Sequence, residues 1–85
     1  MKEFTYVITD REGIHARPAG ILVKEANRFQ SSITIAKGAK SGDLKRIFSV
    51  MALAAKKDET IVVKVEGPDE EEAMQAISDC LKANL

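Results

Sequence analysis

The sequence contains very little cysteine and histidine, and it has no tryptophan. Among its 85 residues there are one cysteine and one histidine. The lone cysteine, Cys80, excludes an internal disulfide and a cysteine-based metal cluster, and we expect it to act as a small apolar residue of a helix. The lone histidine, His15, has no second His or Cys at ligand spacing, so we predict no metal site.

Other absences exclude several classes of protein. No apolar run approaches the length of a membrane span, so we predict no membrane insertion. The first residues lack the apolar segment of a secretory signal, so we expect a cytoplasmic protein. The chain has neither the glycine-rich loop of nucleotide-binding proteins nor the Gly-x-Ser-x-Gly turn of hydrolases. We therefore expect no cofactor, and no complete catalytic cycle carried out by this chain alone.

Neither sign of charge predominates. The 13 Lys and Arg residues equal the 13 Asp and Glu residues in number, which gives a formal net charge of zero. This balance disfavours non-specific binding of nucleic acid. A content of 45% hydrophobic and 31% charged residues is typical of a folded chain. The length predicts one domain, residues 1–85.

The spacing of apolar residues predicts seven elements of secondary structure. The predicted strands are 4–9, 32–37, 40–43 and 60–66, and the predicted helices are 16–28, 44–55 and a last helix with Asp69 as its N-cap. Each strand has one apolar face, and the three amphipathic helices supply the cover for that face. The order β-α-β-β-α-β-α predicts an α+β domain of two layers with an antiparallel sheet.

The most informative segment runs from Gly13 to Ala19 and reads Gly-Ile-His-Ala-Arg-Pro-Ala. It joins a predicted strand to a predicted helix, and Pro18 suits the first turn of that helix. The N-terminus of a helix carries free N–H groups and a partial positive charge, so it favours anions. Imidazole is a nucleophile near neutral pH, and Arg17 can bind phosphate oxygens. This combination predicts that His15 accepts a phosphoryl group.

The second predicted helix carries a possible contact surface. Phe48 lies about 100° around the helix from Ile47, away from the apolar stripe that faces the core. A large aromatic residue outside the core is typical of an interface, although Phe48 could also cover the rim of the core. The basic residues that we expect around it are Lys24, Lys45 and Arg46.

Together with segments 44–53 and 65–70, the Gly13–Ala19 segment resembles the HPr family of histidine-containing phosphocarriers of the bacterial phosphotransferase system. The resemblance covers essentially the whole chain. It implies an open-faced β-sandwich: a four-stranded antiparallel sheet with three helices on one face. It also implies a monomer.

The resemblance implies a specific function. His15 would accept a phosphoryl group on Nδ1 from enzyme I, which phosphoenolpyruvate charges, and would pass it to the enzyme IIA domains of sugar permeases. Arg17 and backbone N–H groups of the first helical turn, that of Ala16 among them, would contact the phosphate. The apolar patch that docks the partners would consist of Ile47, Phe48 and Met51.

Three features depart from the family pattern. Arg46 stands where many relatives have a serine that a regulatory kinase phosphorylates, Ala54 stands where a glycine is common, and Gly38-Ala39 replaces a more usual Asn-Gly turn. The first departure leaves open a regulatory paralogue that is phosphorylated on His15 but signals to regulatory partners rather than serving sugar uptake. A small RNA-binding module is disfavoured, because its only candidate stacking residues, Phe4 and Tyr6, share the face that the helices need.

Overall fold

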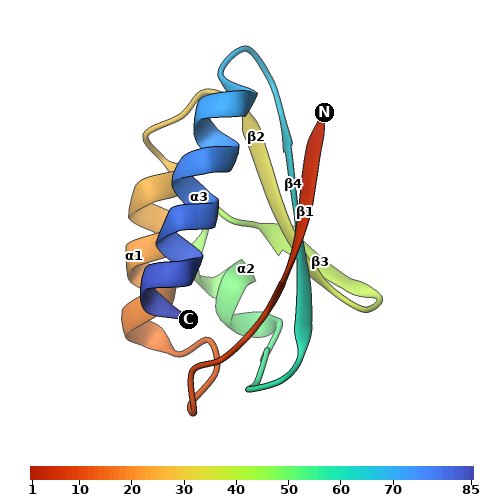
Figure 1. Cartoon of the computed structure of the whole chain (residues 1–85), viewed down its shortest axis with the longest axis vertical. Coiled ribbons are helices and arrows are strands. Elements are labelled where there is room, and N and C mark those ends of the chain that lie inside the picture. Colours follow the sequence, from red (N-terminus) through yellow and green to blue (C-terminus); the bar gives the residue numbers. More distant parts are fainter.

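Strands and helices follow one another in the predicted order in the computed structural model, which describes residues 1–85 (Figure 1). The strands are β1 (Lys2–Val7), β2 (Ser32–Lys37), β3 (Lys40–Asp43) and β4 (Thr60–Glu66). The helices are α1 (Ala16–Ala26), α2 (Ile47–Ala52) and α3 (Glu70–Asn84).

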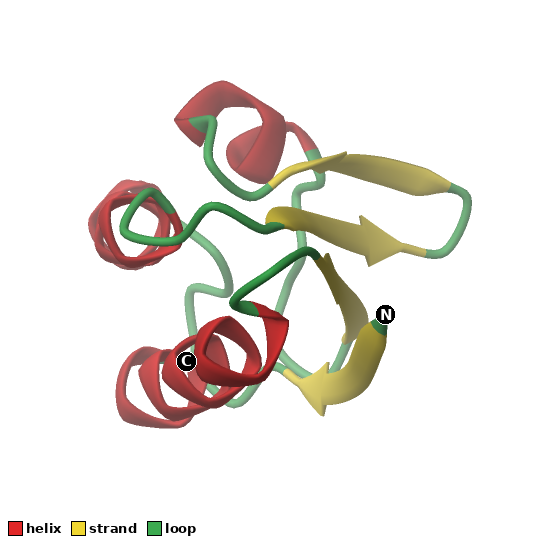
Figure 2. Cartoon of the chain, turned by 90° about the horizontal axis from the view of Figure 1, so that it is seen from above, coloured by secondary structure: helices red, strands yellow, loops and turns green.

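The strands form one four-stranded sheet in the order β1-β4-β2-β3, and every neighbouring pair is antiparallel. In the centre of the sheet Val63 of β4 lies opposite Phe4 of β1 on one side and Ile35 of β2 on the other. All three helices lie on the same side of this sheet (Figure 2). The predicted fold class, an α+β open-faced sandwich, is confirmed.

The core lies between the helices and the covered face of the sheet. Strand alternation explains the pattern on β4, where Ile61, Val63 and Val65 are buried while Lys64 and Glu66 are exposed. Helices α1 and α3 supply the opposite wall with buried residues at helical spacing, such as Leu22 and Ile77. None of the helices is both long enough and apolar enough to cross a membrane.

The second helix is shorter than predicted. We expected it to cover 44–55, but α2 contains only Ile47–Ala52. At its start Leu44 still belongs to the sheet side, because its N–H donates to the carbonyl of Ile33 at 2.9 Å. Beyond its end Ala54 has a φ of 51°, which is a left-handed conformation and cannot continue a right-handed helix. The first strand is also displaced, covering 2–7 instead of 4–9.

The predicted N-cap residue of the last helix is confirmed in position, but its side chain has another role. Asp69 is the N-cap of α3 and its carbonyl accepts the N–H of Ala73, whereas its carboxylate makes no capping hydrogen bond. It accepts hydrogen bonds from the hydroxyl and N–H of Ser31 and from the N–H of Gln30. The hydrogen bond from the Ser31 hydroxyl, followed by the bonds from the backbone N–H groups, lowers the pKa of Asp69. The carboxylate thus joins the chain ahead of β2 to the start of α3.

Replacing Ala54 with glycine is expected to stabilise the protein. A non-glycine residue in the left-handed region is disfavoured by about 1–2 kcal/mol, and Ala54 is exposed, so its methyl group contributes little packing. The greater freedom of glycine in the unfolded chain offsets part of this gain. We expect a net rise in unfolding free energy of about 1 kcal/mol, which corresponds to a melting temperature about 4–8 °C higher.

The matched control is Ala52→Gly. Ala52 is also exposed, but it is the last residue of α2 and has a right-handed conformation. Glycine at that position should lower stability by about 0.5–1 kcal/mol. Equal shifts of the two melting temperatures in the same direction would contradict our account of position 54.

Candidate functional site

The backbone of His15 forms the beginning of α1. His15 is the N-cap residue, with extended backbone angles (φ −115°, ψ −178°), and its carbonyl accepts the N–H of Ala19 at 3.0 Å. Its side chain makes no capping hydrogen bond. The imidazole is therefore free for another role, at about 36% exposure.

Backbone hydrogen bonds fix the loop that precedes His15. The N–H of Gly13 donates to the carbonyl of Asp10 at 3.0 Å, and the N–H of Ile14 donates to the carbonyl of Ala55 at 2.9 Å. Ile14 is buried in the core, and Gly13 has a φ of 68°, a left-handed conformation that favours glycine. These contacts fix the backbone directly ahead of His15.

The first turn of α1 has unused hydrogen-bond donors. No acceptor in the structure takes the N–H of Ala16 or of Arg17, and Pro18 has no N–H. Arg17 is exposed and takes part in none of the ion pairs. The start of α1 therefore offers two free N–H groups and an unpaired guanidinium in the residues directly after His15, which is an arrangement suited to an anion.

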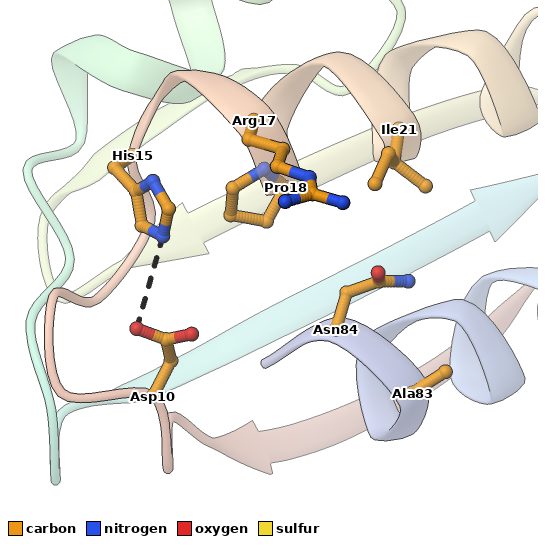
Figure 3. Close-up of a pocket in the computed structure, with 7 residues that line it drawn as sticks. All are labelled: Asp10, His15, Arg17, Pro18, Ile21, Ala83 and Asn84. Carbon is orange, nitrogen blue, oxygen red and sulfur yellow. Dashed lines mark ion pairs between the residues drawn. The ribbon is translucent and has the colours of Figure 1, made fainter.

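A shallow pocket of about 240 Å³ opens beside the imidazole (Figure 3). Its walls come from the loop before α1, from α1 and from the last turn of α3; the residues are Asp10, His15, Arg17, Pro18, Ile21, Ala83 and Asn84. Figure 3 shows Arg17 extending across Pro18 on the α1 side, with Asn84 on the opposite wall. Sequence reasoning missed Asn84 because no local pattern places the end of α3 beside the start of α1.

Sequence reasoning also missed two carboxylates beside the ring. Nε2 of His15 lies 3.3 Å from Oε2 of Glu12 and 3.8 Å from Oδ1 of Asp10. These are ion-pair distances for a protonated ring. The same Oδ1 accepts the N–H of Glu12 at 2.8 Å, which fixes the Asp10 side chain. The i, i+3 spacing of Glu12 and His15 is the signal that could have identified this pair.

The three side chains of this cluster are the one group in the structure that could be compared with a metal site. One ligand-type atom from each of Asp10, Glu12 and His15 lies within 4.8 Å of the others. Glu12 is 73% exposed, and the contacts have the geometry of ion pairs between imidazolium and carboxylate. The cluster is therefore a set of ion-pair contacts, and the absence of a metal site stays a prediction.

The predicted contact surface lies on α2, which packs against α1. Phe48 is 85% exposed and Met51 is 39% exposed, whereas Ile47 is half-buried against the core. The exposure of Phe48 excludes the alternative that it covers the rim of the core.

The three basic residues around this surface differ in availability. Lys24 is exposed and takes part in no ion pair, and Arg46 is 79% exposed with Asp43 at 3.8 Å. Lys45 is half-buried, and its ammonium group donates to the carbonyl of Phe29 at 2.8 Å. Lys24 and Arg46 can therefore meet a partner freely, whereas Lys45 already holds the chain between α1 and β2.

Comparison with known proteins identifies close relatives over nearly the whole chain. The family model described as "PTS HPr component phosphorylation site" matches residues 2–83. The phosphocarrier protein HPr of Mycoplasma capricolum is 46% identical over 81 residues, covering 95% of this chain and 91% of that protein. A solved histidine-containing phosphocarrier protein from Mycoplasma superposes with a TM-score of 0.94 at 44% identity, covering 96% and 93% of the two chains.

A more distant likeness links the chain to a regulatory protein. Crh of Bacillus subtilis, a catabolite repression protein solved as a domain-swapped dimer, has a TM-score of 0.78 at 32% identity, covering 89% of this chain and 87% of its own. The TM-score and the identity are both lower than for the Mycoplasma phosphocarrier.

The family model and the Mycoplasma relatives cover nearly the whole chain. The chain therefore belongs to the HPr family, the phosphocarrier proteins of the phosphotransferase system, which carry a phosphoryl group without catalysing a complete reaction.

Proposed function

We propose that His15 is the phosphoacceptor of this phosphocarrier and that Nδ1 is the atom that carries the group. The observation that supports this most directly is the placement of the lone histidine at the start of α1, beside two free N–H groups and the unpaired Arg17. A phosphoryl group on the ring is doubly negative near neutral pH. The partial positive charge of the helix start and the guanidinium both stabilise such a charge.

The proposed transfer has two steps. First, the lone pair of Nδ1 attacks the phosphorus of phospho-enzyme I; a bond from Nδ1 to phosphorus forms as the bond to the enzyme I side chain breaks. Arg17 and the N–H groups of Ala16 and Arg17 bind the phosphoryl oxygens while charge moves between the two proteins. Second, an acceptor side chain of an enzyme IIA domain attacks the same phosphorus, and neutral imidazole leaves.

Each step needs a partner that docks briefly and then dissociates. Transient complexes use small interfaces with an apolar centre and a polar rim. We propose Ile47, Phe48 and Met51 as that centre, with Lys24 and Arg46 at the rim and a lesser part for Lys45. In this proposal the protein acts as a cytoplasmic monomer and as one domain.

Incubation of the protein with enzyme I and labelled phosphoenolpyruvate tests this function. We expect one label per chain, located on the peptide that contains His15. The label should be labile in acid and stable in base, as a phosphoramidate is. An acid-stable label on a serine or threonine peptide would contradict the assignment.

Transfer onward separates sugar uptake from a regulatory role. Arg46 and the likeness to Crh are the observations that keep the regulatory alternative in consideration. The phosphorylated protein should transfer its phosphoryl group to an enzyme IIA domain in a mixture of the purified components. A stable phospho-protein that transfers to no enzyme IIA domain would favour the regulatory alternative.

Replacing Arg17 with alanine is expected to slow transfer without unfolding the protein. The side chain is exposed and unpaired, so its loss should change the unfolding free energy by no more than about 0.5 kcal/mol. Loss of a charged hydrogen bond to phosphate should raise the transfer barrier by about 1.5–3 kcal/mol. Melting curves and rapid-quench transfer rates measure the two effects. A large fall in melting temperature with normal transfer would contradict this role.

Replacing Phe48 with alanine is expected to weaken binding to enzyme I by about 1–2 kcal/mol, as truncation of an interface anchor does. Because the ring is 85% exposed, stability should hardly change. Titration calorimetry with enzyme I measures the affinity. Val7→Ala is the control, since Val7 is 50% exposed but belongs to β1, on the sheet face away from the helices. Equal losses of affinity in both variants would disprove the location of the patch.

A further inference from the structure

Two carboxylates face the imidazole nitrogen that is not expected to carry the phosphoryl group. Oε2 of Glu12 lies 3.3 Å and Oδ1 of Asp10 lies 3.8 Å from Nε2 of His15, and the Asp10–His15 pair is drawn in Figure 3. Glu12 donates its own N–H to Oδ1 of Asp10 at 2.8 Å, so the two residues form one local unit. The proposed phosphoacceptor therefore has an acidic side at Nε2 and a basic side toward Arg17.

We infer that Asp10 and Glu12 are positioning residues that hold a proton on Nε2 of His15 and stabilise the ring cation that phosphoryl transfer creates. The inference rests on the proposed role of His15 as phosphoacceptor. It adds two residues that contact only the ring and not the phosphoryl group.

The charge balance of the transfer explains why such residues help. The neutral ring bears its proton on Nε2, and its lone pair on Nδ1 attacks phosphorus. After the bond from Nδ1 to phosphorus forms, the ring still holds the Nε2 proton and is a cation. A carboxylate next to Nε2–H stabilises that cation, as a carboxylate does for the histidine of a serine protease.

The same proton assists the second step. When the bond between Nδ1 and phosphorus breaks, its electron pair returns to the ring, and a ring that kept the Nε2 proton leaves as neutral imidazole. A ring that lost this proton would have to leave as an imidazolate anion, which is a far poorer leaving group. Holding the proton therefore keeps the phosphoryl group ready for onward transfer.

The other polar groups that line the pocket act in the opposite sense or not at all. Arg17 and the start of α1 disfavour a ring cation through their positive charge, and Asn84 across the pocket is neutral. Asp10 and Glu12 are the only carboxylates at ion-pair distance from the imidazole. They offset the positive surroundings that bind the phosphate.

The test uses Asp10→Asn, Glu12→Gln and the double variant of the full chain. Asparagine keeps an oxygen that can accept the N–H of Glu12, so the loop should hold its shape. Asp79→Asn is the matched control, because Asp79 is an exposed acid on α3 whose side chain accepts a hydrogen bond from Gln75 and forms no ion pair. The measurements are ¹⁵N chemical shifts of both ring nitrogens with and without the phosphoryl group, the pH profile of phosphohistidine hydrolysis, and the rate of charging by enzyme I.

In the double variant we expect the Nε2 proton of the phosphorylated ring to dissociate at lower pH. We also expect charging and hydrolysis at neutral pH to slow by about two- to fivefold, the size typical of exposed charge pairs. The unphosphorylated wild-type ring should be protonated on Nε2, and the Asp79→Asn protein should behave as wild type. Melting temperatures should be unchanged, because the ion pairs lie at the surface.

The inference would be overturned if the Nε2 proton of the phosphorylated ring dissociated at the same pH in the wild-type and double-variant proteins and the pH profiles of hydrolysis were identical. An unphosphorylated wild-type ring protonated on Nδ1 would also overturn it. Failure of the wild-type protein to accept any label would instead overturn the proposed function. In that event the ring spectra of the unphosphorylated proteins would still decide whether the carboxylates set the position of the proton.

Discussion

The His15→Ala protein is expected to fold as the wild type does and to accept no phosphoryl group from enzyme I. The chain has no second histidine, so no other side chain can form a phosphohistidine. The imidazole is partly exposed and its contacts with Glu12 and Asp10 are surface ion pairs, so its removal should change stability by no more than about 0.5 kcal/mol. The expected effect is therefore complete loss of transfer by a folded protein.

Incorporation of label from phosphoenolpyruvate in the presence of a catalytic amount of enzyme I measures this loss, and circular dichroism tests whether the variant is folded. Cys80→Ala is the control for the lone cysteine of the chain. Burial raises the pKa of the Cys80 thiol, so little thiolate is available, and its replacement should leave labelling intact. Acid-labile label on the His15→Ala protein would refute the assignment of the phosphoacceptor.

Gly13→Ala is expected to destabilise the protein more than Gly38→Ala or Gly20→Ala does. A methyl group at Gly13 would lie 2.3 Å from the carbonyl oxygen of Ala55 and 2.7 Å from Cα of Lys56. The φ of 68° adds left-handed strain. Strain of about 1–2 kcal/mol and overpacking of about 1–3 kcal/mol give a loss of about 2–5 kcal/mol. The melting temperature should fall by at least about 10 °C.

Substitutions at two other glycines separate the left-handed strain from the steric overlap. A methyl group at Gly38 meets nothing within 4 Å although its φ is 59°, so Gly38→Ala should show the left-handed strain alone, about 1–2 kcal/mol. Gly20 lies within α1 in open space, so Gly20→Ala should stabilise the helix by up to about 1 kcal/mol. A Gly13→Ala protein as stable as Gly38→Ala would show that the loop can move away from Ala55 without cost.

The same contact connects stability with transfer. Gly13 and Ile14 fix the backbone ahead of His15 through their contact with Ala55. A shifted loop would move the imidazole relative to Arg17 and the free N–H groups, and small displacements of a reacting atom have large effects on rate. The Gly13→Ala protein should therefore also lose transfer activity at temperatures where it remains folded. Normal transfer at such temperatures would show that the close packing serves stability alone.

The element order and the place of His15 could be predicted from local patterns. The period-2 alternation on 60–66 and the helical spacing around Leu22 depend on neighbouring residues, so they predict element types without a tertiary model. Boundaries were less predictable. The end of α2 depends on Ala54 adopting a left-handed conformation, and alanine gives no local sign of that.

The α+β class, the strand and helix order and the single histidine at a helix start are all encoded in local patterns, because each follows from periodicity or from a residue type that occurs once. The distant groups that meet that histidine are visible only in the folded protein. Asn84 reaches the pocket because α3 packs beside α1, and the carboxylate of Asp69 binds Ser31 instead of the free N–H groups of its own helix. The physical reason is that these contacts arise from packing between elements far apart in the chain, and short-range patterns carry no information about such contacts.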